Sequence, residues 1–168
     1  IEPIDPLSGV VRCQAGVVRG DVLTALSVHH LTPPVLTNNL GVTVGGTLSM
    51  AGLGVASFRD GAQVDNVRSM TVVLASSNVV RCGVDENREL FDLVRCGLGQ
   101  FGIIVEAELV VRSHKPFVRT QYLLYDNLAV LCRDLEVLMR EDRFTNIESW
   151  AVPATQGFRN TPLGRRPF

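Results

Sequence analysis

The segment Val42–Gly54, VTVGGTLSMAGLG, carries four glycines and no charged residue. Its apolar residues suit a buried strand, whereas its glycines suit a loop around a ligand, because glycine lets the main chain approach another group closely. The hydroxyl groups of Thr43, Thr47 and Ser49 fall within the same segment. The segment therefore predicts a ligand-binding loop, and the alternative that its glycines only shape turns stays open.

A second glycine cluster, GLGQFG at Gly97–Gly102, matches the GxGxxG spacing of Rossmann nucleotide sites. In those sites the glycines follow a strand and open a helix whose first amides hold a pyrophosphate. Here the expected order is reversed, since a helical segment precedes the cluster and a strand-like segment follows it. The pattern instead indicates a helix end and a tight turn into a strand. It disfavours a Rossmann-type nicotinamide enzyme.

Both glycine clusters stand beside apolar segments, which indicates that they share one ligand. A large, flat and partly polar molecule fits best. Main-chain N–H and C=O groups would bond its edges, and Leu53, Ile103 and Ile104 would pack against its faces. This interpretation requires that folding brings the bend near Gly46 next to the bend near Gly99.

The composition is that of a folded chain with a sizeable core: 168 residues, 46% hydrophobic residues and a mean hydropathy of +0.20. The length suits one domain or one and a fraction. The formal net charge is −1 and no basic stripe is present, which disfavours nucleic acid as a partner. We expect no membrane span and no signal peptide. Because the chain starts at Ile1 without a methionine, we expect it to be part of a longer protein.

The four cysteines, Cys13, Cys82, Cys96 and Cys132, do not form a CxxC pair. A zinc cluster or a thioredoxin-type redox pair is therefore not expected, and no metal site is predicted. We expect small and mostly buried thiols. Pairing of some of them in a secreted protein stays an open alternative.

Hydrophobic periodicity predicts an irregular mixture of strands and helices, which favours the α+β class. The expected elements are strand 9–18, helix 19–30, a hairpin of strands 70–74 and 79–82, helix 84–97, strand 103–112, strand 114–125 and helix 126–142. Asp21 and Asp126 are the expected helix caps, and Asp85 is expected near the cap of the helix at 84–97. Pro116 is the expected boundary between a first unit and the beginning of a second. From Thr155 onward the chain is rich in turn residues.

The letters of two segments carry a family resemblance. VTVGGTLSMAGLGVASFRDGAQVDNV at 42–67, followed by ELFDLVRCGLGQFGIIVEAELVV at 89–111, resembles the FAD-binding domain of the vanillyl-alcohol oxidase/PCMH flavoprotein superfamily. Within that superfamily the chain is most similar to cytokinin dehydrogenases. The likeness covers about residues 1–112, and the later part is similar to the opening of the family's substrate domain.

The resemblance implies an α+β fold in which residues 1–115 are the second half of a PCMH-type FAD-binding domain and residues 116–168 begin a substrate or cap domain. It implies FAD as the cofactor and an FAD-dependent oxidoreductase that oxidises a C–N or C–O bond of a small molecule by hydride transfer to the flavin. The family's phosphate-binding segment, in the N-terminal part of the flavin domain, is missing, so the chain alone is expected to be inactive. The alternative is a catalytically silent flavin-fold module for binding or assembly.

By position, the resemblance implies several cofactor-binding residues in the two glycine clusters. They are Thr43, Gly45, Gly46, Thr47, Ser49 and Leu53 in the first cluster, and Ile103 or Ile104 directly after the second.

Two positions depart from the cytokinin-dehydrogenase pattern. Met50 stands where those enzymes usually have asparagine. Asn38 stands where they carry an aspartate, five residues before Thr43, which accepts a proton from the substrate amine. An amide is no useful base near neutral pH, so Asn38 is expected to orient a substrate group. The alternative is that Asn38 is only a turn residue after Thr37.

Overall fold

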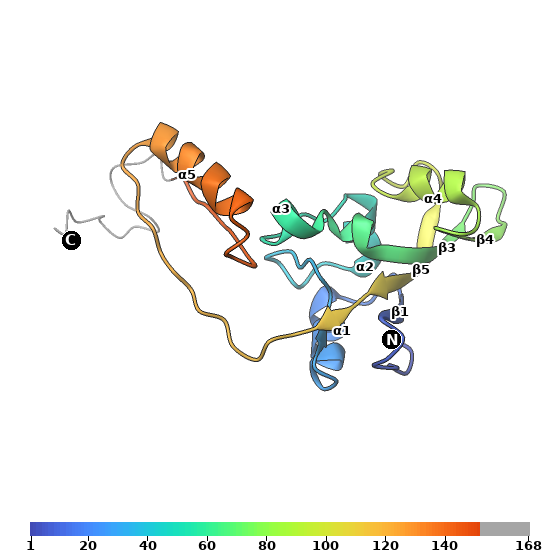
Figure 1. Cartoon of the computed structure of the whole chain (residues 1–168). Helices are drawn as coiled ribbons and strands as arrows, with labels where there is room; N and C mark the ends of the chain where they lie inside the picture. Colours follow the sequence, from blue (N-terminus) through green and yellow to red (C-terminus); the bar gives the residue numbers. More distant parts are fainter. Residues whose placement is uncertain (152–168) are drawn as a thin grey trace.

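A computed structural model of the chain describes residues 1–151. Helices and strands follow each other in the order shown in Figure 1. They are β1 Val10–Gln14, α1 Arg19–Ser27, β2 Leu31–Thr32, α2 Val44–Ser49, α3 Ser57–Asp60, a 3-10 turn Gln63–Asn66, β3 Val67–Val73, β4 Val79–Gly83, α4 Arg88–Val94, β5 Ile103–Val110, β6 Arg112–Ser113 and α5 Leu128–Arg140. The fold is α+β, as expected.

The main sheet has four antiparallel strands in the order β1-β5-β3-β4. One row of its side chains runs across all four strands, because Cys13 is opposite Ala107, Ala107 is opposite Met70, and Met70 is opposite Cys82. Alternate residues of a strand point to opposite faces, and this row faces the core. The helices contribute further buried side chains, among them Val22, Leu26, Val44, Leu48, Phe91 and Val94.

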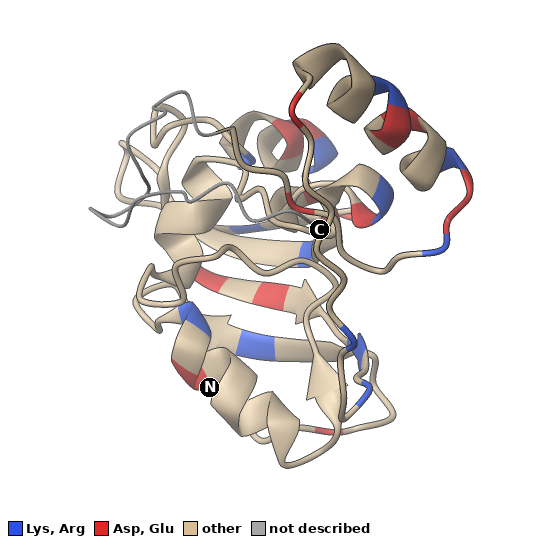
Figure 2. Cartoon of the chain, turned by 90° about the vertical axis from the view of Figure 1, so that its left-hand side faces the viewer, with Lys and Arg blue, Asp and Glu red and all other residues tan. Residues whose placement is uncertain are grey.

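The other face of the sheet carries charges, which Figure 2 shows as bands of both signs along the strands. Glu108 of β5 lies 3.4 Å from Arg12 of β1 and 3.5 Å from Arg81 of β4. Ser69 of β3 also donates a hydrogen bond of 3.0 Å to this carboxylate. The network spans all four strands, so it fixes their lateral order on the polar face as the core does on the other.

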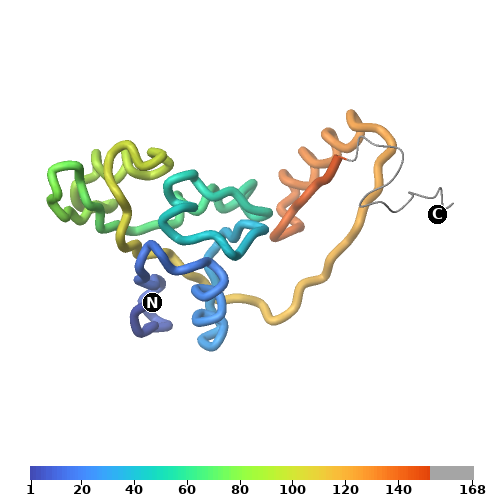
Figure 3. Tube along the Cα trace, turned by 180° about the vertical axis from the view of Figure 1, so that it is seen from behind, coloured from blue at the N-terminus to red at the C-terminus, as the bar shows by residue number. Residues whose placement is uncertain are grey.

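The C-terminal part of the described chain stands apart from the sheet. After the short ladder between β2 and β6, an extended segment leads to α5, and Figures 1 and 3 show it from opposite sides. None of the α5 side chains is buried. The chain then returns to the first unit, where the Ile147 N–H donates to the Val55 carbonyl at 2.9 Å.

Most predicted elements are confirmed: the hairpin strands are longer than expected, and the other elements named here are shorter. The hairpin is β3 and β4, the strand at 103–112 is β5, and the helices at 19–30, 84–97 and 126–142 are α1, α4 and α5. The predicted caps Asp21 and Asp126 are wrong, whereas Asp85 lies near the start of α4, as expected. Val18 and Asn87 occupy the N-cap positions of α1 and α4, and neither makes a side-chain capping bond. Asn127, one residue after Asp126, caps α5 by accepting bonds from the amides of Ala129 and Val130.

Two further expectations differ from the structure. The predicted strand 114–125 is wrong, because this segment has no partner strand in the described chain and its apolar residues remain exposed, for example Phe117 at 88% and Tyr122 at 89%. Part of the glycine-rich segment forms the short helix α2. The sequence did not predict this helix, because glycine disfavours helical structure. The turn-rich segment from Thr155 lies outside the described residues.

The four thiols are free; Cys13 and Cys82 are buried, whereas Cys96 and Cys132 are exposed. The expectation of mostly buried thiols therefore holds for half of them. Within residues 1–151 no group of three or more metal-ligating side chains comes together. In the same range no helix has the length and apolar content needed to cross a membrane.

Thiol labelling tests this arrangement. Burial raises the pKa of the Cys13 and Cys82 thiols, which disfavours the reactive thiolate, and it also blocks access. We expect iodoacetamide to modify Cys96 and Cys132 first in the folded chain, with Cys13 and Cys82 labelled only after denaturant is added. Peptide mass spectrometry measures each site. Rapid labelling of Cys13 without denaturant would contradict the sheet packing.

Candidate functional site

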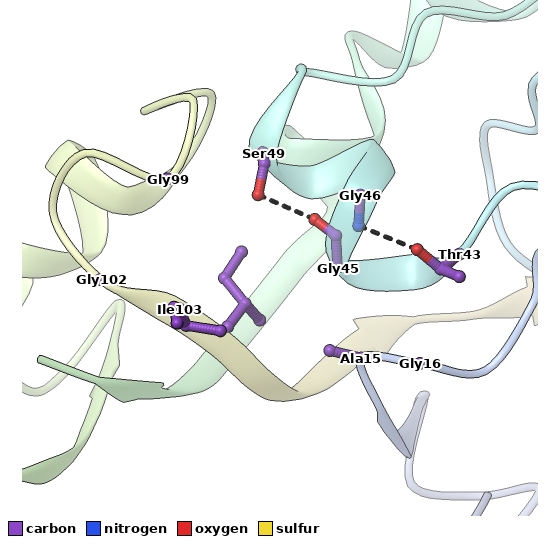
Figure 4. Close-up of a pocket in the computed structure, with 10 residues that line it drawn as sticks. Ala15, Gly16, Thr43, Gly45, Gly46, Ser49, Gly99, Gly102 and Ile103 are labelled. Atoms are coloured by element: carbon purple, nitrogen blue, oxygen red, sulfur yellow. Dashed lines mark hydrogen bonds between the residues drawn. The ribbon is translucent and has the colours of Figure 1, made fainter. Parts of the chain in front are cut away.

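The two glycine clusters meet at one open cleft of about 330 Å³. Figure 4 shows the end of β1, helix α2 and the start of β5 around it. Its lining residues are Ala15, Gly16, Thr43, Gly45, Gly46, Ser49, Gly99, Gly102, Ile103 and Ile104. The requirement that the bends near Gly46 and Gly99 come together is therefore met.

Helix α2 forms the upper wall of this cleft. Thr43 is its N-cap, and its hydroxyl oxygen accepts a hydrogen bond of 3.2 Å from the Gly46 amide. At the other end, the Ser49 hydroxyl donates back to the Gly45 carbonyl at 2.9 Å. These side chains satisfy groups of a helix that is too short and too rich in glycine to be stable alone.

Helix α2 is fixed to the end of β1 by main-chain bonds. The amides of Val44 and Gly45 donate to the carbonyls of Val17 and Ala15, each at 2.9 Å. A Cβ atom at position 45 would lie 2.8 Å from the Cβ of Ala15. Position 45 therefore requires glycine, because any side chain would push the helix off the strand.

The second glycine cluster is bound to the other end of α2. The Cys96 amide donates to the Leu48 carbonyl at 2.9 Å, and the Leu98 amide donates to the Ser49 carbonyl at 3.1 Å. The turn that follows has positive φ at Leu98, Gly99 and Gly102. It then delivers the chain into β5. Helix α2 is thus held between β1 and the 97–102 turn.

A buried arginine supports α2 from below. Arg19 is 2% exposed, and its Nε and Nη2 groups donate to the Thr47 hydroxyl oxygen at 3.0 and 2.8 Å. The Thr47 hydroxyl in turn donates to the Val44 carbonyl at 2.9 Å. Burial lowers the pKa of Arg19 to about 10, because the charged guanidinium is removed from water.

A second cleft of about 410 Å³ lies beside the loop that follows helix α2. It is lined by Asn38, Leu53, Gly54, Val55, Ile147, Glu148 and Ser149. The Asn38 Nδ2 group donates a hydrogen bond of 2.7 Å to Glu148 Oε1. This bond joins two residues from distant parts of the chain.

The predicted site residues divide between these places. Six of them line the first cleft: Thr43, Gly45, Gly46, Ser49, Ile103 and Ile104. Thr47 faces Arg19 within the protein, and Leu53 lies with Asn38 at the second cleft. Whether each residue contacts a cofactor stays a prediction.

Sequence reasoning missed several residues at the two clefts. Ala15 and Gly16 had a signal, a glycine just after a β-branched strand. Arg19 looks like a surface residue at a helix start, and Glu148 lies in a segment without periodicity. Neither of these two positions carries a local signal, because their roles depend on contacts with distant residues.

The first cleft fits a flat, partly apolar ligand. A Cβ atom at Gly16 or Gly99 would meet no protein atom within 4 Å, so both positions leave open space beside the cleft. Ile103 lines the cleft and is 68% exposed. Leu98 and Phe101 of the adjoining turn also remain 58% and 43% exposed. Main-chain groups and uncovered apolar side chains together favour a planar ring system.

Comparison with known proteins shows the family of the chain and the cofactor of that family. Residues 1–83 match the family described as FAD binding domain. The chain belongs to the FAD-binding PCMH-type flavoproteins. FAD is the cofactor of this family, and the first cleft, with its open glycine positions and exposed Ile103, fits a part of it.

Relatives of this flavoprotein are similar along most of the chain. An uncharacterized oxidoreductase of the fasciation locus in Rhodococcoides fascians is 44% identical over 86% of the chain and 33% of its own length. Cytokinin dehydrogenase 7 of Oryza sativa subsp. japonica is 41% identical over 85% of the chain and 29% of its length. Cytokinin dehydrogenase 5 of Arabidopsis thaliana is 41% identical over 79% and 25%. The chain thus spans at most about a third of these relatives.

The support of α2 by Arg19 can be tested by removing the Thr47 hydroxyl oxygen, which accepts the hydrogen bonds of Arg19. Thr47→Val leaves two buried guanidinium donors without their acceptor, so we expect the free energy of unfolding to fall by about 2 kcal/mol. Thr24→Val is the matched control, because the exposed Thr24 hydroxyl bonds only within α1, to the Gly20 carbonyl. Urea unfolding measures both. Equal stability of the two variants would contradict the proposed support.

Proposed function

We propose that the complete flavoprotein is an oxidoreductase of the cytokinin-dehydrogenase type. It oxidises a C–N or C–O bond of a small molecule, and cytokinins, which name several of its relatives, are the first substrates to test. FAD, when bound, is the oxidant of this reaction, because it accepts the hydride. The observation that carries the proposal is the first cleft, which both glycine clusters line.

The roles proposed for the chain's residues follow from their places around the cleft. The main chain at Gly45 and Gly46 and the residues Thr43 and Ser49 form one wall, and Ile103 and Ile104 form the floor. Thr47 acts indirectly by holding α2 on Arg19. Leu53 covers the ring system on the side of the second cleft, where we place the substrate.

We propose two partial domains. Residues 1–115 form the C-terminal portion of the flavin domain, and residues 116–168 begin a substrate or cap domain. The described part of the second unit supports this division, because α5 has no buried side chain and its exposed apolar residues, such as Leu128 and Val137, need a partner surface outside residues 1–151.

The alternative is a catalytically silent flavin-fold module, which the amide at Asn38 keeps open. The dehydrogenase and oxidoreductase names of the relatives favour the catalytic proposal. Substrate-dependent bleaching of the flavin absorption distinguishes the two, because a silent module holds the cofactor but does not reduce it.

Anaerobic titration of the complete protein tests the proposal. We expect a yellow preparation whose visible absorption is bleached by at least one compound from a panel of isopentenyladenine, N-methylbenzylamine and benzyl alcohol. The 168-residue chain alone is the comparison, and it is expected to bind FAD weakly or not at all. A complete flavoprotein that no compound of the panel reduces would favour the silent module.

The position of the cofactor can be tested at Gly16. A side chain added there meets no protein atom, so Gly16→Leu should fold normally while it obstructs the first cleft. We expect the FAD content of the purified complete protein to fall at least tenfold, with Gly16→Ala intermediate. Flavin absorption relative to protein absorption measures this, and circular dichroism checks the fold. Full FAD occupancy in Gly16→Leu would place the cofactor elsewhere.

A further inference from the structure

Two histidines meet where the short ladder between β2 and β6 ends. In this antiparallel ladder Leu31 pairs with Ser113. The next position along each strand carries a histidine, and the His114 amide donates a hydrogen bond of 2.9 Å to the His30 carbonyl. The centroids of the two imidazole rings lie 5.8 Å apart. Folding therefore brings together two metal-ligating side chains from distant parts of the chain.

The main chain holds both histidines in place. His30 has a φ of 56°, a left-handed conformation that histidine adopts more readily than most residues, and its amide donates to the Ser27 carbonyl at 3.0 Å. Leu31, the next residue, is buried in the core. On the other strand, Val111 is buried three residues before His114. Both imidazoles are thus carried by backbone that the core anchors.

A hydrogen bond of the His114 ring determines which of its nitrogens is free. The Nδ1 atom lies 3.1 Å from the Lys115 carbonyl oxygen. A carbonyl oxygen can only accept, so Nδ1 carries the proton, and Nε2 of the neutral ring keeps its lone pair. Metal-binding histidines are commonly oriented in this way, because they donate the other ring N–H to a carbonyl or a carboxylate.

The spacing of the two rings suits one metal ion between them. A zinc–nitrogen bond of about 2.0 Å places the ion about 3.2 Å from the centroid of each ring that binds it. Two such rings have centroids about 5.2 Å apart at a tetrahedral angle and about 5.8 Å apart at an angle of about 130°. The observed 5.8 Å lies in this range. The alternative is a plain contact between two aromatic rings.

The ligand type selects the class of ion. Imidazole suits Zn²⁺, Cu²⁺ and Ni²⁺, whereas Mg²⁺ and Ca²⁺ prefer oxygen ligands. Within residues 1–151 no third ligating side chain joins the pair, so water is expected at the remaining positions of the ion. His30 is exposed and His114 is half-buried, which lets an ion enter from solvent.

We propose that His30 and His114 form a binding site for one divalent transition-metal ion, with Zn²⁺ as the reference ion. The His114 Nε2 atom is one ligand, and a ring nitrogen of His30 is the other. A bound ion closes the end of the β2–β6 ladder and fixes the point at which the chain leaves the first unit toward α5. Neither histidine lines a cleft, so the site is independent of the proposed function.

Calorimetry of the complete protein with Zn²⁺ tests this site. The second imidazole binds an ion that the first already holds, so loss of either should weaken zinc binding by about tenfold to a hundredfold. The variants are His114→Gln and His30→Asn, because asparagine tolerates the positive φ at position 30. His29→Gln is the matched control, since His29 is the exposed neighbour of His30. It should bind Zn²⁺ as the wild type does, and Mg²⁺ should not compete.

Urea unfolding gives a second readout. An ion that binds only the folded protein raises the free energy of unfolding. Saturating Zn²⁺ should therefore raise the urea midpoint of the wild type and of His29→Gln more than that of His30→Asn or His114→Gln. The exposed thiols Cys96 and Cys132 are the same in every protein compared, so any Zn²⁺ that they bind cancels in the comparison.

The inference requires that both site variants weaken zinc binding and that the control does not. Unchanged binding in either His30→Asn or His114→Gln would overturn it, as would an equal loss in His29→Gln. A plain contact between the rings predicts that all four proteins bind Zn²⁺ alike. None of these outcomes bears on the bleaching of the flavin, so failure of the metal site and failure of the proposed function are distinguishable.

Discussion

The rest of the site depends on one constraint: α2 must lie directly on the end of β1. The amide of Gly45 reaches the Ala15 carbonyl at 2.9 Å, and only the absence of a side chain at position 45 permits this approach. From that position the far end of α2 accepts the amide of Leu98. A helix of six residues is thereby held at both ends, and the open space between β1, α2 and β5 becomes a cleft.

Beneath this cleft the protein buries the charged guanidinium of Arg19, although removing a charge from water lowers the stability of a fold. Arg19 has a single threonine hydroxyl as the acceptor of two of its donors, and removal from water lowers its pKa to about 10. The buried Arg19 fixes the position of α2, because the Thr47 hydroxyl that accepts its bonds also donates a hydrogen bond within α2. Support for α2 therefore comes from the core side, which leaves the glycine main chain uncovered on the side of the first cleft.

The second cleft is built differently. Glu148 belongs to a segment beyond α5, a helix with no buried side chain, and it reaches Asn38 across 110 positions of sequence. The first cleft is formed by sheet strands, helix α2 and the 97–102 turn, whereas the second cleft is lined in part by residues 147–149, none of which is buried.

The sequence by itself determined the class, the hairpin, the strand after GLGQFG, the helix at 126–142 and the family, because these depend on local periodicity and on contiguous motifs. Tertiary structure decided the rest. Glycine-rich α2 is a helix only because the end of β1 and the 97–102 turn bind its ends, and the apolar segment 114–125 is no strand because it has no partner strand within residues 1–151. The hydrogen bonds of Arg19 to Thr47 and of Asn38 to Glu148 are encoded by no local pattern, since bonds between distant residues exist only once the chain has folded.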